Sequence, residues 1–212
     1  MESETYEPIE SIDFIGGAVC LDFVNTASAR QAGPFRERLH GYRDLVTWGE
    51  RVGLVSSEHG VALRAEAAGR PAEAEAALER GRALREAVYR VFSAQSQGQP
   101  PAGTDLDTLT REYAEAASHR RLTCDSERVE LEWEQESGYL DQVLWPVAQS
   151  AIELLVSDER ARVKECATDN CNWLFLDASK NRSRRWCEMR ECGNRAKARR
   201  HYARVRKTKE NP

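Results

Sequence analysis

Four of the six cysteines lie close together in the last quarter of the sequence. Cys166 and Cys171 form a C-x4-C pair, fifteen residues follow, and Cys187 and Cys192 form a second C-x4-C pair. Zinc binds four thiolates tetrahedrally, and a short pair presents two sulfurs from one side of a turn. We therefore predict one Zn2+ ion held by these four side chains. Because protein atoms would fill every coordination position, the predicted role is structural and not catalytic.

Little else in the sequence is typical of catalysis. The chain contains no glycine-rich phosphate loop and no nucleophile motif, so we expect a protein that is not an enzyme. Cys20 and Cys124 lie far from the cluster, and free cysteines are usually small buried hydrophobes, so both are predicted to be core residues. The acidic start of the sequence lacks the layout of a secretion signal, which favours reduced thiols and a cytoplasmic location.

The charges are divided unevenly along the chain. The 212 residues carry a net charge of −4, yet residues 1–159 carry −14 and residues 160–212 carry +10. The whole-chain value argues against nucleic acid as a partner, because phosphate binding depends on Lys and Arg. The segment values instead indicate an acidic body, residues 1–159, and a basic module, residues 160–212. Four thiolates around Zn2+ would lower the charge of the module to about +8.

The positive charge is concentrated after the fourth cysteine. Residues 193–209 contain eight basic residues, no acidic residue and no proline, a composition that predicts a helix. Its basic side chains fall into two sectors, and Ala198, Tyr202 and Val205 form an apolar strip predicted to pack on the module. Such a helix suits phosphate contacts or the major groove of DNA. The predicted nucleic-acid-binding residues are Arg184, Arg185, Arg195, Lys197, Arg199, Arg200, Arg204, Arg206 and Lys207.

Other partners are compatible with the same composition. RNA, an acidic protein surface such as the chain's own body, and plain solvation would each suit a basic helix. Trp173 and Trp186 are predicted to form the small core of the module, since so short a segment has few other apolar residues. No apolar stretch approaches the ~18 residues of a membrane span, so we expect no membrane partner. The oligomeric state is not written in the sequence.

The elements that must position this module belong to a mostly helical body. Apolar periodicity predicts helices over 41–53, 71–95, 104–113 and 140–155, with Pro146 either kinking the last one or starting a new helix. A further short helix is predicted over 58–68. Alternation predicts a β-hairpin with strands at 121–124 and 129–133, joined by a turn at 125–127. The run FIGGAVCLDFV, residues 14–24, is predicted to contain a strand.

Two places in the body are candidate sites for a small ligand. Asp22 and Asn25 are polar residues in an otherwise apolar run, where they would either line a pocket or form a turn at the end of a strand. Arg82 and Arg85 lie on one predicted helix and would bind a small anion or pair with neighbouring glutamates. A structural role is the commoner outcome at both places.

The run C-x4-C-x-W-x-F-L-D-x-S-K-N-x-S-R-R-W-C-x-M-x-x-C-G-N-R-x-K, within residues 166–206, resembles the CGNR zinc finger, named for Cys192, Gly193, Asn194 and Arg195. The segments G-x-x-C-L-D-F-V-N-T at 17–26 and D-L-x-x-W at 44–48 resemble features of the ABATE domain. That domain precedes this finger in a family described as a putative stress-induced transcription regulator. The resemblance implies zinc at the four cysteines and a role in transcription.

The sequence thus predicts an α+β protein, with a mostly helical body, a few strands and a small treble-clef-like zinc module at the C-terminal end. The predicted order within the module is thiol turn, hairpin, thiol pair and helix. The leading hypothesis is a regulator that binds DNA through the module while the body senses a ligand or a partner. The alternative is a zinc-stabilised module for a metabolite or a protein, whose basic helix docks on an acidic protein surface.

Overall fold

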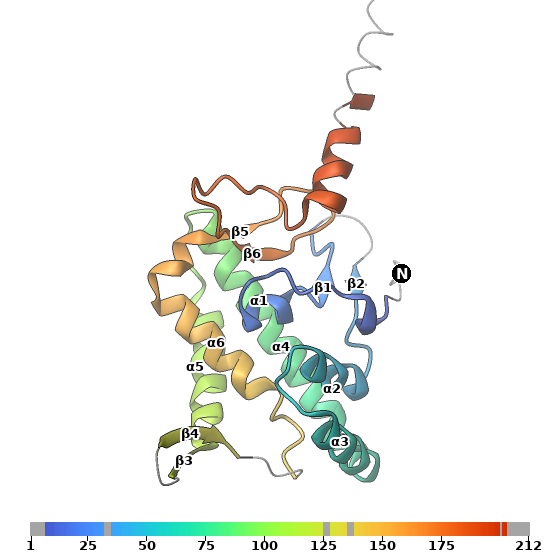
Figure 1. Cartoon of the computed structure of the whole chain (residues 1–212), viewed down its shortest axis with the longest axis vertical. Coiled ribbons are helices and arrows are strands. Elements are labelled where there is room, and N and C mark those ends of the chain that lie inside the picture. The colour runs from blue at the N-terminus through green and yellow to red at the C-terminus, as the bar shows by residue number, and fades with distance from the viewer. Residues whose placement is uncertain (1–6, 32–34, 125–127, 135–137, 200, 203–212) are drawn as a thin grey trace, which may run out of the picture.

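The computed structural model describes residues 7–31, 35–124, 128–134, 138–199 and 201–202. Its longest element is α4 (Pro71–Ser96), which runs through the middle of the body (Figure 1). Pro71 occupies the first turn, where its fixed φ suits a helix and its missing N–H costs nothing. Leu78, Leu84, Val88 and Phe92 of α4 are fully buried, so this helix supplies one wall of the core.

Shorter helices surround α4. They are α1 (Val19–Val24), α2 (Tyr42–Arg51), α3 (Ser57–Gly69), α5 (Gly103–Ser118) and α6 (Leu144–Val156), with 3-10 turns at Ile9–Ser11 and Asp158–Arg162. The predicted helices of the body are confirmed, and Pro146 falls in the first turn of α6, where it starts a helix and does not kink one. Among the described residues, no helix combines the length and apolar character needed to span a bilayer.

Three small antiparallel sheets complete the described part of the fold. Strands β1 (Ala27–Ser28) and β2 (Arg36–Glu37) pair, as do β3 (Arg120–Cys124) and β4 (Val129–Trp133), and β5 (Val163–Glu165) and β6 (Leu174–Leu176). The strands of the predicted hairpin are confirmed as β3 and β4, and its turn lies outside the described residues. The fold class is therefore as predicted, a mostly helical body with a four-cysteine module.

The prediction of a strand within residues 14–24 is wrong. Residues Val19–Val24 form α1, and four of its six residues are buried. A helix that is apolar on every side shows no 3.6-residue period, so a short buried helix and a buried strand look alike in sequence. Cys20 is buried here as predicted, and burial raises the pKa of its thiol to about 12. Cys124, in contrast, is exposed on β3, so its predicted place in the core is wrong.

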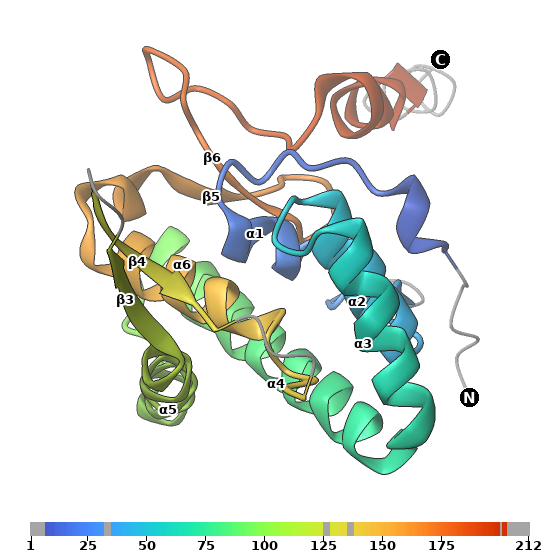
Figure 2. The ribbon, with the colours of Figure 1, turned by 60° about the horizontal axis from the view of Figure 1, so that its bottom comes forward.

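The core of the body continues into the module. Val163 on β5 and Leu174 on β6 belong to the same buried cluster as the body helices, and Trp173 and Leu176 pack against it. Gly17 has a φ of +82°, and an added Cβ would lie 3.2 Å from the Cβ of Leu176. Glycine at this position therefore provides the turn and admits β6 at close range. Figure 2 shows β5 and β6 lying over α1.

Candidate metal centre and basic helix

The four predicted zinc ligands come together in one cluster. Cys166, Cys171, Cys187 and Cys192 are all buried, and their four sulfurs lie within 4.8 Å of one another. The Sγ atom of Cys187 lies 3.5 Å from that of Cys171 and 3.6 Å from that of Cys192. Four sulfurs placed about 2.3 Å from a central zinc would be separated by about 3.8 Å. The geometry and the four soft donors fit one Zn2+ ion.

Hydrogen bonds among the four thiols act in opposite directions. They hold the pKa of the Cys166 thiol below its ordinary value and those of Cys171 and Cys187 above it, so a bound divalent cation would supply the charge that keeps all four sulfurs as thiolates. Phe175 is fully buried against the four cysteines, and Trp173 and Trp186 pack around them. The small aromatic core predicted for the module is thereby confirmed. Since protein sulfurs supply the full set of four ligands, the site is a structural zinc site.

Strands β5 and β6 present the first thiol pair. Cys166 follows β5, Cys171 precedes β6, and the N–H of Cys166 donates to the carbonyl oxygen of Trp173 across the turn at 2.9 Å. The sequence predicted a hairpin after the first pair, whereas the hairpin in the structure encloses it. The difference arises because Val163, which precedes the first cysteine, supplies one of the two strands and is buried in the core of the body.

A buried carboxylate, Asp177, organises the loop between the two thiol pairs. It accepts hydrogen bonds from Lys164 Nζ at 2.6 Å, from Ser179 N at 3.0 Å and from Arg184 N at 3.0 Å. Sequence analysis did not single out this residue as functional. The available signal was the D-x-S pattern of residues 177–179, because Asp side chains often bond to the backbone two residues later.

The guanidinium of Arg184 continues this scaffold and was predicted to contact nucleic acid. Its Nε donates to the carbonyl oxygen of Trp186 at 3.1 Å, and its Nη2 donates to the carbonyl oxygen of Cys187. Its guanidinium carbon lies 4.3 Å from the centre of the Phe175 ring. Arg184 therefore holds the backbone around the third zinc ligand, and its nucleic-acid role stays a prediction.

The second thiol pair leads directly into the basic helix. Residues Met189–Gly193 form one π-type turn, and residues 194–199 and 201–202 are α-helical. The N–H of Gly193 donates to the carbonyl oxygen of Glu188 at 3.0 Å, and Asn194 Nδ2 donates to the carbonyl oxygen of Arg190 at 2.8 Å. The Cys-Gly-Asn part of the motif thus fixes where the helix begins and places that start at the four-cysteine cluster.

The predicted basic residues fall into three groups. Arg185, Arg195, Lys197 and Arg199 are exposed, and Arg199 forms an ion pair with Asp169. The structure brings Arg195, Lys197 and Arg199 together on one helix that extends away from the body (Figure 1). Arg184 belongs to the scaffold of the zinc site. The other four, Arg200, Arg204, Arg206 and Lys207, lie outside the described residues.

The predicted apolar strip does not pack on the module. Ala198 is exposed, 72% of the surface of Tyr202 is exposed, and Val205 lies outside the described residues. The prediction is wrong because the helix is held at its N-terminal turn by Cys192 and then leaves the module. No described residue covers the strip, and both basic and apolar positions face solvent.

Two family models match the chain, one in the body and one in the zinc module. Residues 17–158 match the ABATE family, whose description is "Putative stress-induced transcription regulator". The chain belongs to the ABATE family. Residues 162–205 match the CGNR zinc finger, which includes all four cysteines of the cluster. No curated protein sequence matches the chain. The ABATE description names a regulator of transcription and not an enzyme.

Within the ABATE region, Asp22 and Asn25 lie on and just after α1. Asp22 accepts a hydrogen bond from the N–H of Gly16 at 2.8 Å. Asn25 is fully buried, and its side chain bonds to both backbone groups of Leu174 on β6. Both residues have structural contacts at the junction with the zinc finger, and a ligand at this place stays a prediction.

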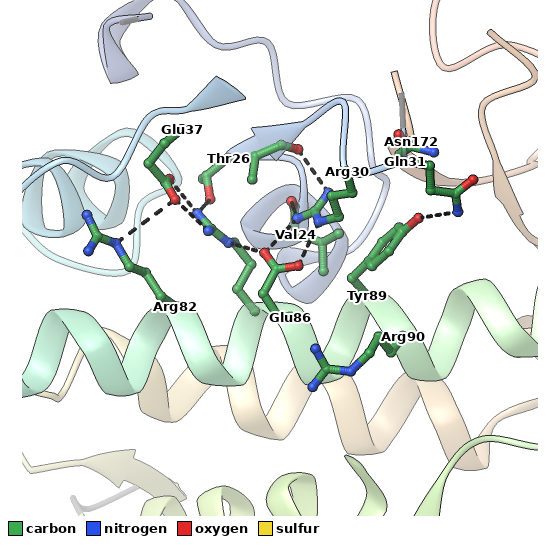
Figure 3. Close-up of polar contacts among 12 residues, drawn as sticks. Val24, Thr26, Arg30, Gln31, Glu37, Arg82, Glu86, Tyr89, Arg90 and Asn172 are labelled. Atoms are coloured by element: carbon green, nitrogen blue, oxygen red, sulfur yellow. Dashed lines mark hydrogen bonds and ion pairs between the residues drawn. The ribbon is translucent and has the colours of Figure 1, made fainter. Parts of the chain in front are cut away.

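The other ABATE candidates, Arg82 and Arg85, lie in a buried ionic network between α4 and β2. Arg85 donates to both carboxylate oxygens of Glu37 at 2.6 Å, and its Nε bonds Glu86 at 2.9 Å. Burial alone would raise the pKa of Glu37, but the hydrogen bonds and charge of Arg85 hold it below its ordinary value. Figure 3 shows Glu37, Thr26 and Glu86 converging in this network, with Arg82 reaching Glu37 from one side.

Arg82 also donates to the carbonyl oxygen of Leu39 and pairs with Glu79. The pairing of both arginines with neighbouring glutamates is the alternative that the sequence offered. The structure brings Arg82 and Arg85 together on α4, whereas Asp22 and Asn25 form a separate group at α1. A small-molecule role for Arg82 and Arg85 stays a prediction.

Proposed function

We propose that this ABATE protein is a cytoplasmic transcription regulator that binds DNA through its zinc finger. The observation that carries the proposal is the position of the helix that begins at residue 194. Arg195, Lys197 and Arg199 are exposed on it, and its first turn is fixed by the zinc ligand Cys192. A helix that is anchored at one end and carries several exposed cations is the kind of element that DNA-binding proteins place in a major groove.

The contacts of the helix favour an external polyanion over the chain's own acidic body. In the described part of the helix, the ion pair is made with Asp169, which belongs to the finger and not to the body. The pair is exposed on both sides, with 59% of the Arg199 side chain and 61% of the Asp169 side chain accessible. Such a pair is worth at most about 1 kcal/mol, so phosphate can displace it readily.

Arg185 extends the proposed surface beyond the helix. Its side chain is exposed, and its guanidinium carbon lies 5.6 Å from the centre of the Trp186 ring. We assign it to phosphate contact, together with the helix residues. Arg184 has its guanidinium engaged by two carbonyl oxygens, and we assign it to the support of the site. The division of the chain into a body, residues 1–159, and a zinc module, residues 160–212, is part of this proposal. DNA recognition is placed in the module.

A salt series tests the proposal. Binding of the full-length, zinc-loaded protein to a random pool of fluorescent DNA duplexes is measured by anisotropy between low and physiological salt. The slope of log K against log salt is negative, and its magnitude should decrease by about 0.9 for each phosphate contact removed. The variant Arg195→Gln/Lys197→Gln/Arg199→Gln should therefore bind weakly and with a shallower slope. A matched control is Arg111→Gln, since Arg111 is 67% exposed on α5 of the body.

Parallel titrations with duplex RNA and an acidic peptide separate the alternatives. Stronger binding of the peptide than of DNA would favour the second hypothesis, a zinc-stabilised module that docks on acidic proteins. Equal DNA affinity of the triple variant and the control would contradict the placement of DNA on this helix. If the wild type binds DNA and the triple variant does not, selection of enriched duplexes from the pool would give the target sequence.

A further inference from the structure

Arg38, which follows β2 in the ABATE body, has a buried guanidinium that is only partly paired. Only 9% of its side chain is exposed. Its Nη2 pairs with Glu7, whereas Nε and Nη1 are shielded from solvent and have no hydrogen-bond partner among the described residues. A buried charge with unused donors is costly unless other charges compensate for it. The position of Arg38 therefore calls for negative charge close by.

Glu7 supplies only part of that negative charge. Its second carboxylate oxygen pairs with Nη1 of Arg36 at 3.1 Å, so one carboxylate serves two arginines. In the described part of the chain, Glu7 is the one carboxylate that forms an ion pair with Arg38. The three side chains together keep a net charge of +1.

The zinc finger lies against this positive group. The guanidinium carbon of Arg38 lies 5.5 Å from the centre of the Trp173 ring, and Trp173 packs against the four cysteines. The N–H of Ala29, which follows β1, donates to the carbonyl oxygen of Cys171 at 3.2 Å. Because β1 pairs with β2, this bond brings both strands to the second zinc ligand. Burial lowers the pKa of Arg38, and the charges of Glu7 and Cys171 oppose that effect.

A loaded zinc centre has the charge that Arg38 lacks. Four thiolates around one Zn2+ carry a net charge of −2, and charges attract more strongly in the protein interior than in water. On the finger side, Arg184 already donates to the carbonyl oxygen of Cys187. With Arg38, each part of the molecule presents one arginine to the centre.

We propose that Arg38 is the counter-charge that the ABATE body supplies to the zinc centre. Its guanidinium lies against Trp173 and stabilises the negative charge of the four thiolates and zinc without bonding to a sulfur. Arg38 is a positioning residue in this sense, and the body thereby sets how tightly the finger holds its metal. The effect is reciprocal, so bound zinc stabilises the buried arginine to the same extent.

Competition between the full-length protein and a chromophoric zinc chelator at fixed pH measures the affinity for zinc. Arg38→Met should lower that affinity about tenfold or more, as loss of a residue outside the ligand set commonly does. Arg38→Lys keeps the charge and should stay within a few-fold of the wild type. The control is Arg51→Met, because Arg51 lies over Phe14 and donates to two carbonyl oxygens of the body. Its loss should weaken the body and leave the zinc affinity of the folded protein unchanged.

Glu7→Gln distinguishes a counter-charge from a structural clamp. If the pair of Glu7 and Arg38 acted only as a clamp, loss of either side chain would weaken zinc binding. A counter-charge predicts opposite signs, because removal of the carboxylate leaves the charge of Arg38 to the zinc centre. Glu7→Gln should therefore bind zinc several-fold more tightly, and it decides the sign even if Arg38→Met does not fold.

Cobalt in place of zinc gives a spectroscopic readout. The sulfur-to-cobalt charge-transfer band should move to longer wavelength in Arg38→Met, since the sulfur electrons are easier to displace without the cation. The band should stay in place in Arg38→Lys and Arg51→Met. Wild-type zinc affinity in Arg38→Met, a lysine variant no better than the methionine variant, or weaker zinc binding in Glu7→Gln would overturn the proposal. No nucleic acid is present, so the result is independent of the DNA-binding test.

Discussion

The side-chain amide of Asn25 pairs with the backbone of Leu174 as a neighbouring strand would. Its Nδ2 donates to the carbonyl oxygen of Leu174 at 2.9 Å, and the N–H of Leu174 donates to its Oδ1 at 2.9 Å. Both residues are completely buried, and 149 positions separate them in sequence. One side chain at the end of α1 thereby satisfies an edge of β6 and fixes the zinc finger to the body.

We expect Asn25→Ala to destabilise the whole chain by about 2–5 kcal/mol, because it leaves two buried backbone groups of Leu174 without partners. Chemical denaturation followed by circular dichroism measures the loss. Asn181→Ala is the control, since Asn181 is exposed in the loop between the thiol pairs. A change in unfolding free energy as small as the control's would contradict the role given to this pair.

Zinc removal should unfold more than the finger. The purified protein is expected to contain about one zinc per chain, and Cys187→Ser should lose most of it. Because Leu174 and Val163 lie in the core of the body, the melting temperature of the helical body should fall with the metal. Elemental analysis and thermal melts with and without a chelator measure both effects.

Cys124→Ser is the matched control for the metal experiment, because Cys124 is exposed and outside the cluster. It should keep both the zinc content and the melting temperature of the wild type. A body that melts at the same temperature with and without metal would show that the two parts fold separately.

The buried pair of Arg85 and Glu37 should behave as a structural unit. Arg85→Met removes the guanidinium that pairs with both oxygens of the buried Glu37 carboxylate, and the cost should be about 3–5 kcal/mol. The double variant Arg85→Met/Glu37→Leu removes both charges and should recover part of that loss, although the N–H of Leu39 then loses its acceptor. Denaturation of the two single variants and the double variant gives the coupling energy. Additive losses would indicate that the two side chains act independently.

Asp22 should make stability depend on pH. Burial raises the pKa of its carboxyl to about 6 from the ordinary 3.8, so the folded chain binds this proton more tightly than the unfolded chain does. The contribution of Asp22 to stability is therefore greatest below about pH 4 and is lost as the pH rises through about 6. Asp22→Asn keeps an oxygen that accepts from the N–H of Gly16 and has no charge to bury.

Relative to the wild type, Asp22→Asn should be nearly neutral at about pH 4 and stabilising by at most about 3 kcal/mol at about pH 7. Denaturation at several pH values gives this difference directly. A difference that does not change between those two values would mean that the carboxylate is not penalised by burial.

Much of the site could be predicted because spacing and composition report on it directly. The four cysteines are recognisable from two C-x4-C pairs, and α2, α4, α5 and α6 show apolar periodicity because each keeps part of its surface in solvent. Helix α1 shows none, since it is buried on most sides. The role of Arg184 was also hidden, because an arginine that bonds carbonyl oxygens has the same sequence signature as one that binds phosphate. Only the three-dimensional position of Cys187 distinguishes them.

Strand β6 belongs to the zinc finger, but its Leu174 is part of the core of the body, and this matters for protein engineering. A fusion cut at residue 160 would leave a hydrophobic gap in the donor, where Val163 and Leu174 had been, and would graft those two aliphatic residues, uncovered, onto the recipient. Transplanting the basic helix and its zinc site to another scaffold would therefore require α1 and the facing surface of α4 as well. In this molecule the portable unit is larger than the metal-binding motif.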